Sequence, residues 1–253
     1  MRIIRSRPRA LVLIGSIAFL LGPWSAGACG GAAPAGQPAR SPGEASPSPA
    51  GPPRAVWVLS PLGLNVHATP AASGSRVEVA PQGTRLDVVG SRTVGSERWL
   101  QVTAADTGDR GWVLDRPDLV IDQQVSLHVD QASGYSLLFP SGWAIGTSGA
   151  TTTFTGTDAS MLVQTSDDPG RLLTTPIAPG KELEERGPIE VYGVTTYLTV
   201  YRRNGGGFEY DVKVRFPKTG VGYLFEFEQR TGSRPDTSLF EQLLDSVSVP
   251  GEV

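Results

Sequence analysis

Hydrophobic residues between positions 55 and 122 come in short runs, and turn residues separate these runs at regular intervals. The six runs are Val56–Leu59, Leu64–Val66, Arg76–Val79, Leu86–Val89, Trp99–Val102 and Gly111–Val113. A spacing of about ten residues, with glycine at the breaks, is typical of a small all-β barrel. We therefore predict that residues 55–122 form one such domain.

A second series of β-rich runs leads to one helical pattern, so residues 123–253 are predicted to form an α+β domain. The predicted strands are Tyr135–Phe139, Thr151–Thr155, Met161–Thr165, Ile189–Val200, Glu209–Phe216 and Gly222–Glu228. Near the end, apolar residues recur on one helical face, at Leu239, Phe240, Leu243, Leu244 and Val247. Either Asp236 or Thr237 suits the N-cap of this helix. The run Gly180–Arg186 is predicted to form a second, short helix.

A different pattern precedes both domains. Four arginines fall within the first nine residues, and the apolar run Ala10–Leu21 follows them. This run is shorter than the roughly 20 residues that a membrane-spanning helix needs, and it fits the hydrophobic part of a secretory signal peptide. Residues 1–28 are therefore predicted to be a signal peptide.

Small residues stand directly before Cys29, the single cysteine of the chain. The sequence Ser25-Ala26-Gly27-Ala28-Cys29 resembles the lipobox of bacterial lipoproteins, with Ala26 where that family prefers leucine. The resemblance implies cleavage before Cys29, a diacylglyceryl group on its thiol, and attachment to the outer face of the cell membrane. Ala26-Gly27-Ala28 also fits cleavage by ordinary signal peptidase, which would release the protein. A lone thiol forms neither an internal disulfide nor a cysteine-based metal cluster.

Between Cys29 and the first domain, the chain consists almost entirely of glycine, alanine, proline and serine, and it holds no large apolar residue. A segment of this composition buries no core, so residues 29–54 are predicted to be a disordered tether. The average reach of such a tether is roughly 25–30 Å, which lifts the domains clear of the lipid headgroups.

Four short motifs in the first domain follow one another in an informative order. They are Leu64–Pro70, Gln82-Gly83-Thr84 with the strand after it, Trp99–Val102, and Gly111-Trp112-Val113. Their order and spacing resemble bacterial SH3-like domains over residues 56–121, with His67 where the family usually has arginine. The resemblance implies an SH3-like barrel that targets cell-wall material or a protein.

The second domain shows another resemblance. Its first strand leads into Pro140, Gly142 and Trp143, and its predicted helix is followed by Ser246 and Val247. These features resemble the PsbP-like family, which implies an antiparallel-sheet α/β sandwich. The alternative is a generic antiparallel sheet covered by one helix.

Charge argues against nucleic acid as a partner. The net charge is −3, and the arginines of the leader hide a more acidic remainder. Phosphate binding needs a clustered basic surface, whereas Arg202-Arg203 is the one pair of adjacent basic residues after the leader. We therefore expect no nucleic acid partner.

The two histidines, His67 and His128, show no metal-site pattern, since no cysteine or acid stands at ligand spacing from them. His67 is predicted to lie in a turn and His128 on a strand. Asp167-Asp168 is predicted to be a polar turn, because two adjacent acids supply too few oxygens for calcium.

The acids Glu182, Glu184 and Glu185 are predicted to be a solvated helix face, not paired catalytic carboxylates. The chain has no Gly-x-Ser-x-Gly motif, no phosphate loop and no dinucleotide fingerprint. We therefore predict a protein that is not an enzyme and that holds no cofactor and no metal.

Three tryptophans, Trp57, Trp99 and Trp112, lie in the predicted barrel. Aromatic side chains either fill the core of so small a domain or line a groove in which peptides or sugars stack. Both interpretations stand at the level of sequence, and Trp57 is the first candidate for a possible ligand groove.

An anchor, a tether and two domains without a catalytic set favour a binding function. We predict an envelope lipoprotein that binds cell-wall material, such as peptidoglycan, or an envelope protein. Tethering at the membrane raises the local concentration of such a binder. The alternative is an assembly or structural factor that docks on a membrane complex.

Overall fold

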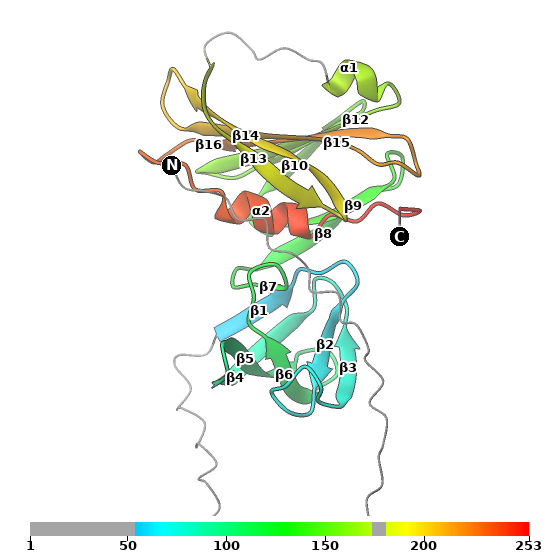
Figure 1. Cartoon of the computed structure of the whole chain (residues 1–253), viewed down its shortest axis with the longest axis vertical. Coiled ribbons are helices and arrows are strands. Elements are labelled where there is room, and N and C mark those ends of the chain that lie inside the picture. Colours follow the sequence, from blue (N-terminus) through cyan, green and yellow to red (C-terminus); the bar gives the residue numbers. More distant parts are fainter. Residues whose placement is uncertain (1–53, 174–180, 253) are drawn as a thin grey trace, which may run out of the picture. The chain divides into compact units, whose positions relative to one another are not determined.

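The structure is a computed structural model that describes residues 54–173 and 181–252, and most of its regular elements are strands (Figure 1). The predicted signal peptide, Cys29 and nearly all of the predicted tether lie outside the described residues. Within the described ranges, no helix is long and apolar enough to cross a membrane.

The first domain is a seven-stranded antiparallel sheet in the order β3-β2-β6-β5-β4-β1-β7. Its strands are β1 (Arg54–Val58), β2 (Leu64–His67), β3 (Arg76–Ala80), β4 (Arg85–Val94), β5 (Glu97–Ala104), β6 (Arg110–Leu114) and β7 (Val120–Ile121). The six predicted runs of this region each overlap one of the first six strands, so the all-β prediction is confirmed.

Buried and exposed side chains alternate along these strands, so the apolar side chains gather on one side of the sheet and form a core. Val56, Val66, Leu100 and Val113, which come from four different strands, are fully buried in the same hydrophobic cluster. Because side chains from distant strands of one sheet meet in one core, the sheet curls around itself. Within each strand, the residues directly before and after a core residue point outward.

The second domain contains two sheets and two helices. The strands of the small sheet are β8 (Val125–Asp130) and β9 (Tyr135–Pro140). The large sheet has the order β10-β11-β12-β16-β15-β14-β13 and contains β10 (Ala144–Ser148), β11 (Thr151–Thr155), β12 (Ala159–Ser166), β13 (Lys181–Val191), β14 (Val194–Arg203), β15 (Phe208–Arg215) and β16 (Gly222–Gln229). The helices are α1 (Pro169–Leu173) and α2 (Ser238–Asp245).

The two faces of the large sheet have different surroundings. Phe240, Leu243 and Leu244 of α2 pack with β9 and with Tyr210 and Phe225 of the sheet in the main core, and we call this side the inner face. The helix α1 lies on the opposite, outer face, where a Cβ on Gly222 would meet the ring of Pro169 (Figure 1). Trp143 also packs against the core and stacks on Phe227 with ring centroids 6.3 Å apart.

The helix predicted over Gly180–Arg186 is wrong, because Lys181–Val191 is strand β13. Lys181 pairs with Arg203 and Leu183 with Tyr201 on β14, and an irregularity follows between Leu183 and Glu185. The residues favour a helix locally, but pairing with a long neighbouring strand outweighs so weak a preference.

The single strand predicted over Ile189–Val200 is also wrong, because a tight turn divides it into β13 and β14. Val191 pairs with Val194, which leaves Tyr192 and Gly193 as the turn residues. Their φ angles are 46° and 82°, as two-residue hairpin turns of the primed type require. Tyrosine seldom adopts a positive φ, so residue type alone does not predict this turn.

Candidate functional site

The outward side of β2, β5 and β6 carries His67, Trp99, Gln101 and Trp112, which we call the aromatic face. Antiparallel pairing sets Trp112 opposite both His67 and Gln101. The residues next to them along the chain, such as Leu100 and Val113, are buried in the core. Alternation therefore turns the four residues to the same side of the sheet.

The aromatic face is held by ring contacts and by one hydrogen bond. The rings of His67 and Trp99 meet edge to face, with centroids 5.6 Å apart and planes at 87°. His67 Nδ1 lies 3.0 Å from the carbonyl oxygen of Gly74, to which it donates. Trp99 is only 2% exposed, whereas His67 and Trp112 are half-buried. The ring surface that a ligand could reach therefore comes from Trp112 and His67.

Trp57 does not join this face. It is partly buried and packs against a small cluster of Leu59, Ile121, Val125 and Leu138. Of the three tryptophans considered for a groove, Trp99 and Trp112 thus lie on the same side of the sheet. Trp57 packs against a different cluster.

A second group of functional side chains lies on the outer face of the large sheet. Glu209 and Asp211 of β15 and Glu226 of β16 each place a carboxylate oxygen within 4.8 Å of the others. Asp211 lies directly opposite Glu226 in the strand register. Glu209 is buried and accepts a hydrogen bond from the ammonium group of Lys181. We call these three acids the carboxylate cluster.

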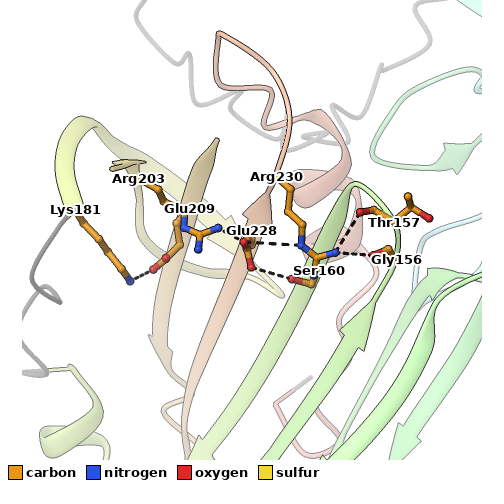
Figure 2. Close-up of polar contacts among 8 residues, drawn as sticks. All are labelled: Gly156, Thr157, Ser160, Lys181, Arg203, Glu209, Glu228 and Arg230. Atoms are coloured by element: carbon orange, nitrogen blue, oxygen red, sulfur yellow. Dashed lines mark hydrogen bonds and ion pairs between the residues drawn. The ribbon is translucent and has the colours of Figure 1, made fainter. Parts of the chain in front are cut away.

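Near Glu209 of the carboxylate cluster lie the ion pairs of Glu228, as Figure 2 shows. Glu228 of β16 accepts from the guanidinium group of Arg203 and from the hydroxyl of Ser160, the latter at 3.3 Å. Arg230 follows and donates to the carbonyl oxygens of Gly156 and Thr157 at 2.8 and 3.2 Å. Glu228 is thus neutralised by arginine.

Burial changes the protonation of two acids in the carboxylate cluster, Asp211 and Glu226. It raises the pKa of Asp211 to about 7, and the neighbouring charges of Glu209 and Glu226 act in the same direction. Burial also raises the pKa of Glu226, with a further contribution from Glu209. Oδ1 of Asp211 is buried and has no hydrogen-bond partner among residues 54–173 and 181–252.

Carboxylate oxygens at this spacing are the ligands that divalent cations use in proteins. Lys181 already neutralises Glu209, however, and the raised pKa values favour the protonated forms of its neighbours. The arrangement can therefore hold a proton. Sequence reasoning missed this cluster, although acids at alternate positions, as in Glu209 and Asp211, mark one side of a strand.

His128 and Asp168, which the sequence also raised as candidates, make contacts that stabilise the fold. His128 lies on β8, as predicted, and its ring contacts Phe154 and Tyr135 at centroid distances of 5.2 and 5.9 Å. Burial lowers the pKa of His128. Asp168 accepts a hydrogen bond of 3.2 Å from the backbone N–H of Arg171, so it caps α1. The polar turn predicted there is the start of that helix.

The acids of the wrongly predicted helix lie on strand β13. Glu182 and Glu184 are exposed there and Glu185 is half-buried, and Glu184 forms an ion pair with Arg202. They are spread along an edge strand of the large sheet, so they do not form a solvated helix face.

Half of the chain is similar in structure to two solved proteins. Cyanobacterial PsbP (CyanoP) from a Synechocystis species is 19% identical, and the match covers 49% of this chain and 92% of that protein with a TM-score of 0.35. The Ran-binding protein Mog1p from Saccharomyces cerevisiae is 9% identical, with coverage of 50% and 96% and a TM-score of 0.36. The PsbP-like α/β sandwich expected from the sequence stays a prediction.

A comparison of the sequence with curated proteins finds no match. The family described as bacterial SH3 domain, by contrast, matches residues 62–116. These residues run from just before β2 to just after β6 and include the whole aromatic face. The SH3-like resemblance predicted over residues 56–121 is therefore confirmed for residues 62–116, which are similar to that family.

Proposed function

We propose that this protein is a non-enzymatic binding module of the bacterial cell envelope and that its SH3 domain contacts cell-wall material. The observation that carries the proposal is the SH3 match over residues 62–116. The aromatic face supports it, because Trp112 and His67 present half-buried rings side by side on adjacent strands. Rings in this setting offer a surface on which sugars or peptides stack.

The histidines support a non-catalytic role. Within residues 54–173 and 181–252, the ring of His67 is bonded to a backbone carbonyl, and the ring of His128 lies between aromatic side chains. Neither arrangement prepares a serine or a water molecule for attack, which needs a base within hydrogen-bond reach of the nucleophile.

The rest of the chain fits delivery of this module to the wall. We propose that Cys29 carries a lipid anchor, that residues 30–53 act as a tether, and that the second domain is a PsbP-like α/β sandwich that offers a further binding surface. A tethered binder needs only modest affinity, because the anchor keeps its concentration near the wall high.

A sedimentation assay with purified peptidoglycan tests the wall-binding proposal. The wild-type chain is expected to sediment with peptidoglycan, and Trp112→Ala is expected to weaken binding by about fivefold or more, as loss of a contact worth about 1 kcal/mol does. Tyr197→Ala is the matched control, because Tyr197 is an aromatic residue of the second domain with 55% exposure. Circular dichroism should show both variants folded.

Two results would reject the wall-binding proposal. The first is wild-type protein that stays in solution at every peptidoglycan concentration. The second is equal loss of binding in Trp112→Ala and Tyr197→Ala. Cross-linking in cells that captures one protein partner and no wall material would support the assembly role instead.

A further inference from the structure

The carboxylate cluster holds more negative charge than its nearest cation neutralises. The ammonium group of Lys181 is bonded to Glu209, which leaves Asp211 and Glu226 facing each other across the β15–β16 pair. Like charges that are directly opposite on antiparallel strands destabilise the sheet. A proton shared among the three acids would remove this repulsion.

The geometry provides a place for such a proton. The three carboxylate groups approach within 4.8 Å, and the side chains of Glu209 and Glu226 are close enough for a hydrogen bond between them. An ionised carboxylate only accepts hydrogen bonds, so a bond between two such groups requires that one of them carry a proton. The buried Oδ1 of Asp211 has no donor in the part of the chain that the structure describes, so it would be left as an unsolvated charge if Asp211 ionised.

We propose that the carboxylate cluster of Glu209, Asp211 and Glu226 is a proton-binding site that is occupied at acidic to neutral pH, and that loss of its proton at higher pH destabilises the outer face of the large sheet. The pKa of Asp211, raised to about 7, agrees with this proposal. It goes beyond the proposed wall binding, which it neither requires nor affects.

Charged and titratable groups from four elements surround the cluster. They are Lys213 on β15, Glu228 on β16, Tyr201 and Arg203 on β14, and Lys181 at the start of β13. The helix α1, which contacts β15 and β16, contributes Arg171. Lys181 and Lys213 favour ionised Asp211, but burial and the two neighbouring acids outweigh them.

The direction of the pH dependence follows from the direction of the pKa shift. Asp211 has an ordinary value of 3.8 and a raised value in the folded protein, so the folded state binds more protons between these two values. The cluster's contribution to stability is therefore full below about pH 4 and is lost as the pH rises to about 7. Burial lowers the pKa of His128, so its contribution to stability changes with pH in the opposite direction over an overlapping range. The test must therefore separate the effect of the cluster from that of His128.

The test compares the melting temperature of the full chain, in mild detergent, with that of Asp211→Asn between about pH 5 and pH 8. The asparagine amide imitates a protonated carboxyl group. As the pH rises, the melting temperature of the variant is therefore expected to increase by several degrees relative to that of the wild type. Taking the difference between the two proteins cancels the contribution of His128. Glu182→Gln, which neutralises an exposed acid of β13, is the control and is expected to show a constant difference.

A titration by carboxyl carbon NMR of the wild-type protein keeps the proposal testable even if Asp211→Asn does not fold. At least one of the three acids is expected to titrate with a midpoint near pH 7. The proposal is overturned if all three titrate below about pH 5, as ordinary carboxyl groups do. It is also overturned if a folded Asp211→Asn variant follows the wild type at every pH.

Discussion

At the scale of single residues, β2 approaches β6 so closely at Gly111 that there is no space for a side chain. A Cβ on Gly111 would lie 2.8 Å from the carbonyl oxygen of His67 and would overlap the side chain of Val66. Gly111→Ala is therefore expected to lower the free energy of unfolding of the SH3-like domain by about 1–3 kcal/mol, as overpacking of a core does. Urea denaturation followed by tryptophan fluorescence measures this loss.

Gly146→Ala is the matched control for this prediction. Gly146 is also a strand glycine, on β10, and a Cβ there would meet no atom within 4 Å. Its substitution is expected to change stability by less than about 0.5 kcal/mol. Equal losses in the two variants would show that the close approach at Gly111 is not the cause.

His128 makes a second prediction at this scale. Burial lowers its pKa from the ordinary value of 6.5, and its Nε2 has no hydrogen-bond partner among the described residues. The unfolded chain therefore takes up a proton at a higher pH than the folded protein, so acidification below about pH 6.5 should destabilise the second domain. His128→Leu keeps an apolar side chain beside Phe154 and Tyr135 and removes this titration.

The measurement is the melting temperature of each protein at about pH 7 and about pH 5. The wild type is expected to lose more stability on acidification than His128→Leu. If both proteins lose the same amount, the half-buried ring of His128 does not account for the acid sensitivity of the domain.

At the scale of elements, the start of α2 depends on a residue outside the helix. Thr237 occupies the N-cap position, but its side chain makes no capping hydrogen bond. Asp236 Oδ1 instead accepts from the backbone N–H and the hydroxyl of Ser238, at 3.0 and 2.6 Å. Asp236→Ala is therefore expected to cost about 1 kcal/mol of stability, whereas Thr237→Ala is expected to cost a few tenths.

Chemical denaturation of the two variants at neutral pH checks this order. The bonds from Ser238 lower the pKa of Asp236, so its contribution should disappear as the pH falls below the ordinary value of 3.8. A larger loss for Thr237→Ala than for Asp236→Ala would contradict the capping role given to Asp236.

The strands that the sequence predicted well have one apolar side and one polar side, as in Tyr223–Glu228, where alternate aromatic residues are buried. The missed strand β10 lacks this signal, because all five of its residues are exposed. The start of β13 was misassigned because its acids and leucine favour a helix, and only the pairing with β14 corrects that local preference.

The candidate sites were predictable to a similar extent. The tryptophans of the SH3 domain were found by residue type, but which of them share a face depends on strand pairings that residue type does not reveal. The carboxylate cluster combines Asp211 with Glu226, which are opposite each other only because β15 pairs with β16. Acids on one strand can be recognised by their period of two, whereas contacts between strands need the topology.

At the scale of the whole molecule, the proposed function requires that the SH3 domain remain close to the wall. The affinity of a single half-buried aromatic surface is modest. A high local concentration of the protein near the wall is therefore needed for substantial binding. The lipid anchor proposed for Cys29 would supply it. Removing that anchor should leave peptidoglycan binding in solution intact and abolish the association of the protein with membranes.

Cys29→Ser makes this prediction testable, because serine keeps the size of the side chain and lacks the thiol that carries the lipid. The wild type is expected in the membrane fraction, with the mass of residues 29–253 plus an acylated glycerol, and Cys29→Ser is expected to lose that added mass and leave the membrane. Equal sedimentation of both purified proteins with peptidoglycan would show that the anchor and the SH3 domain act independently. A wild-type mass equal to that of the unprocessed chain would exclude the anchor, and the SH3 domain would then need a higher intrinsic affinity to act at the wall.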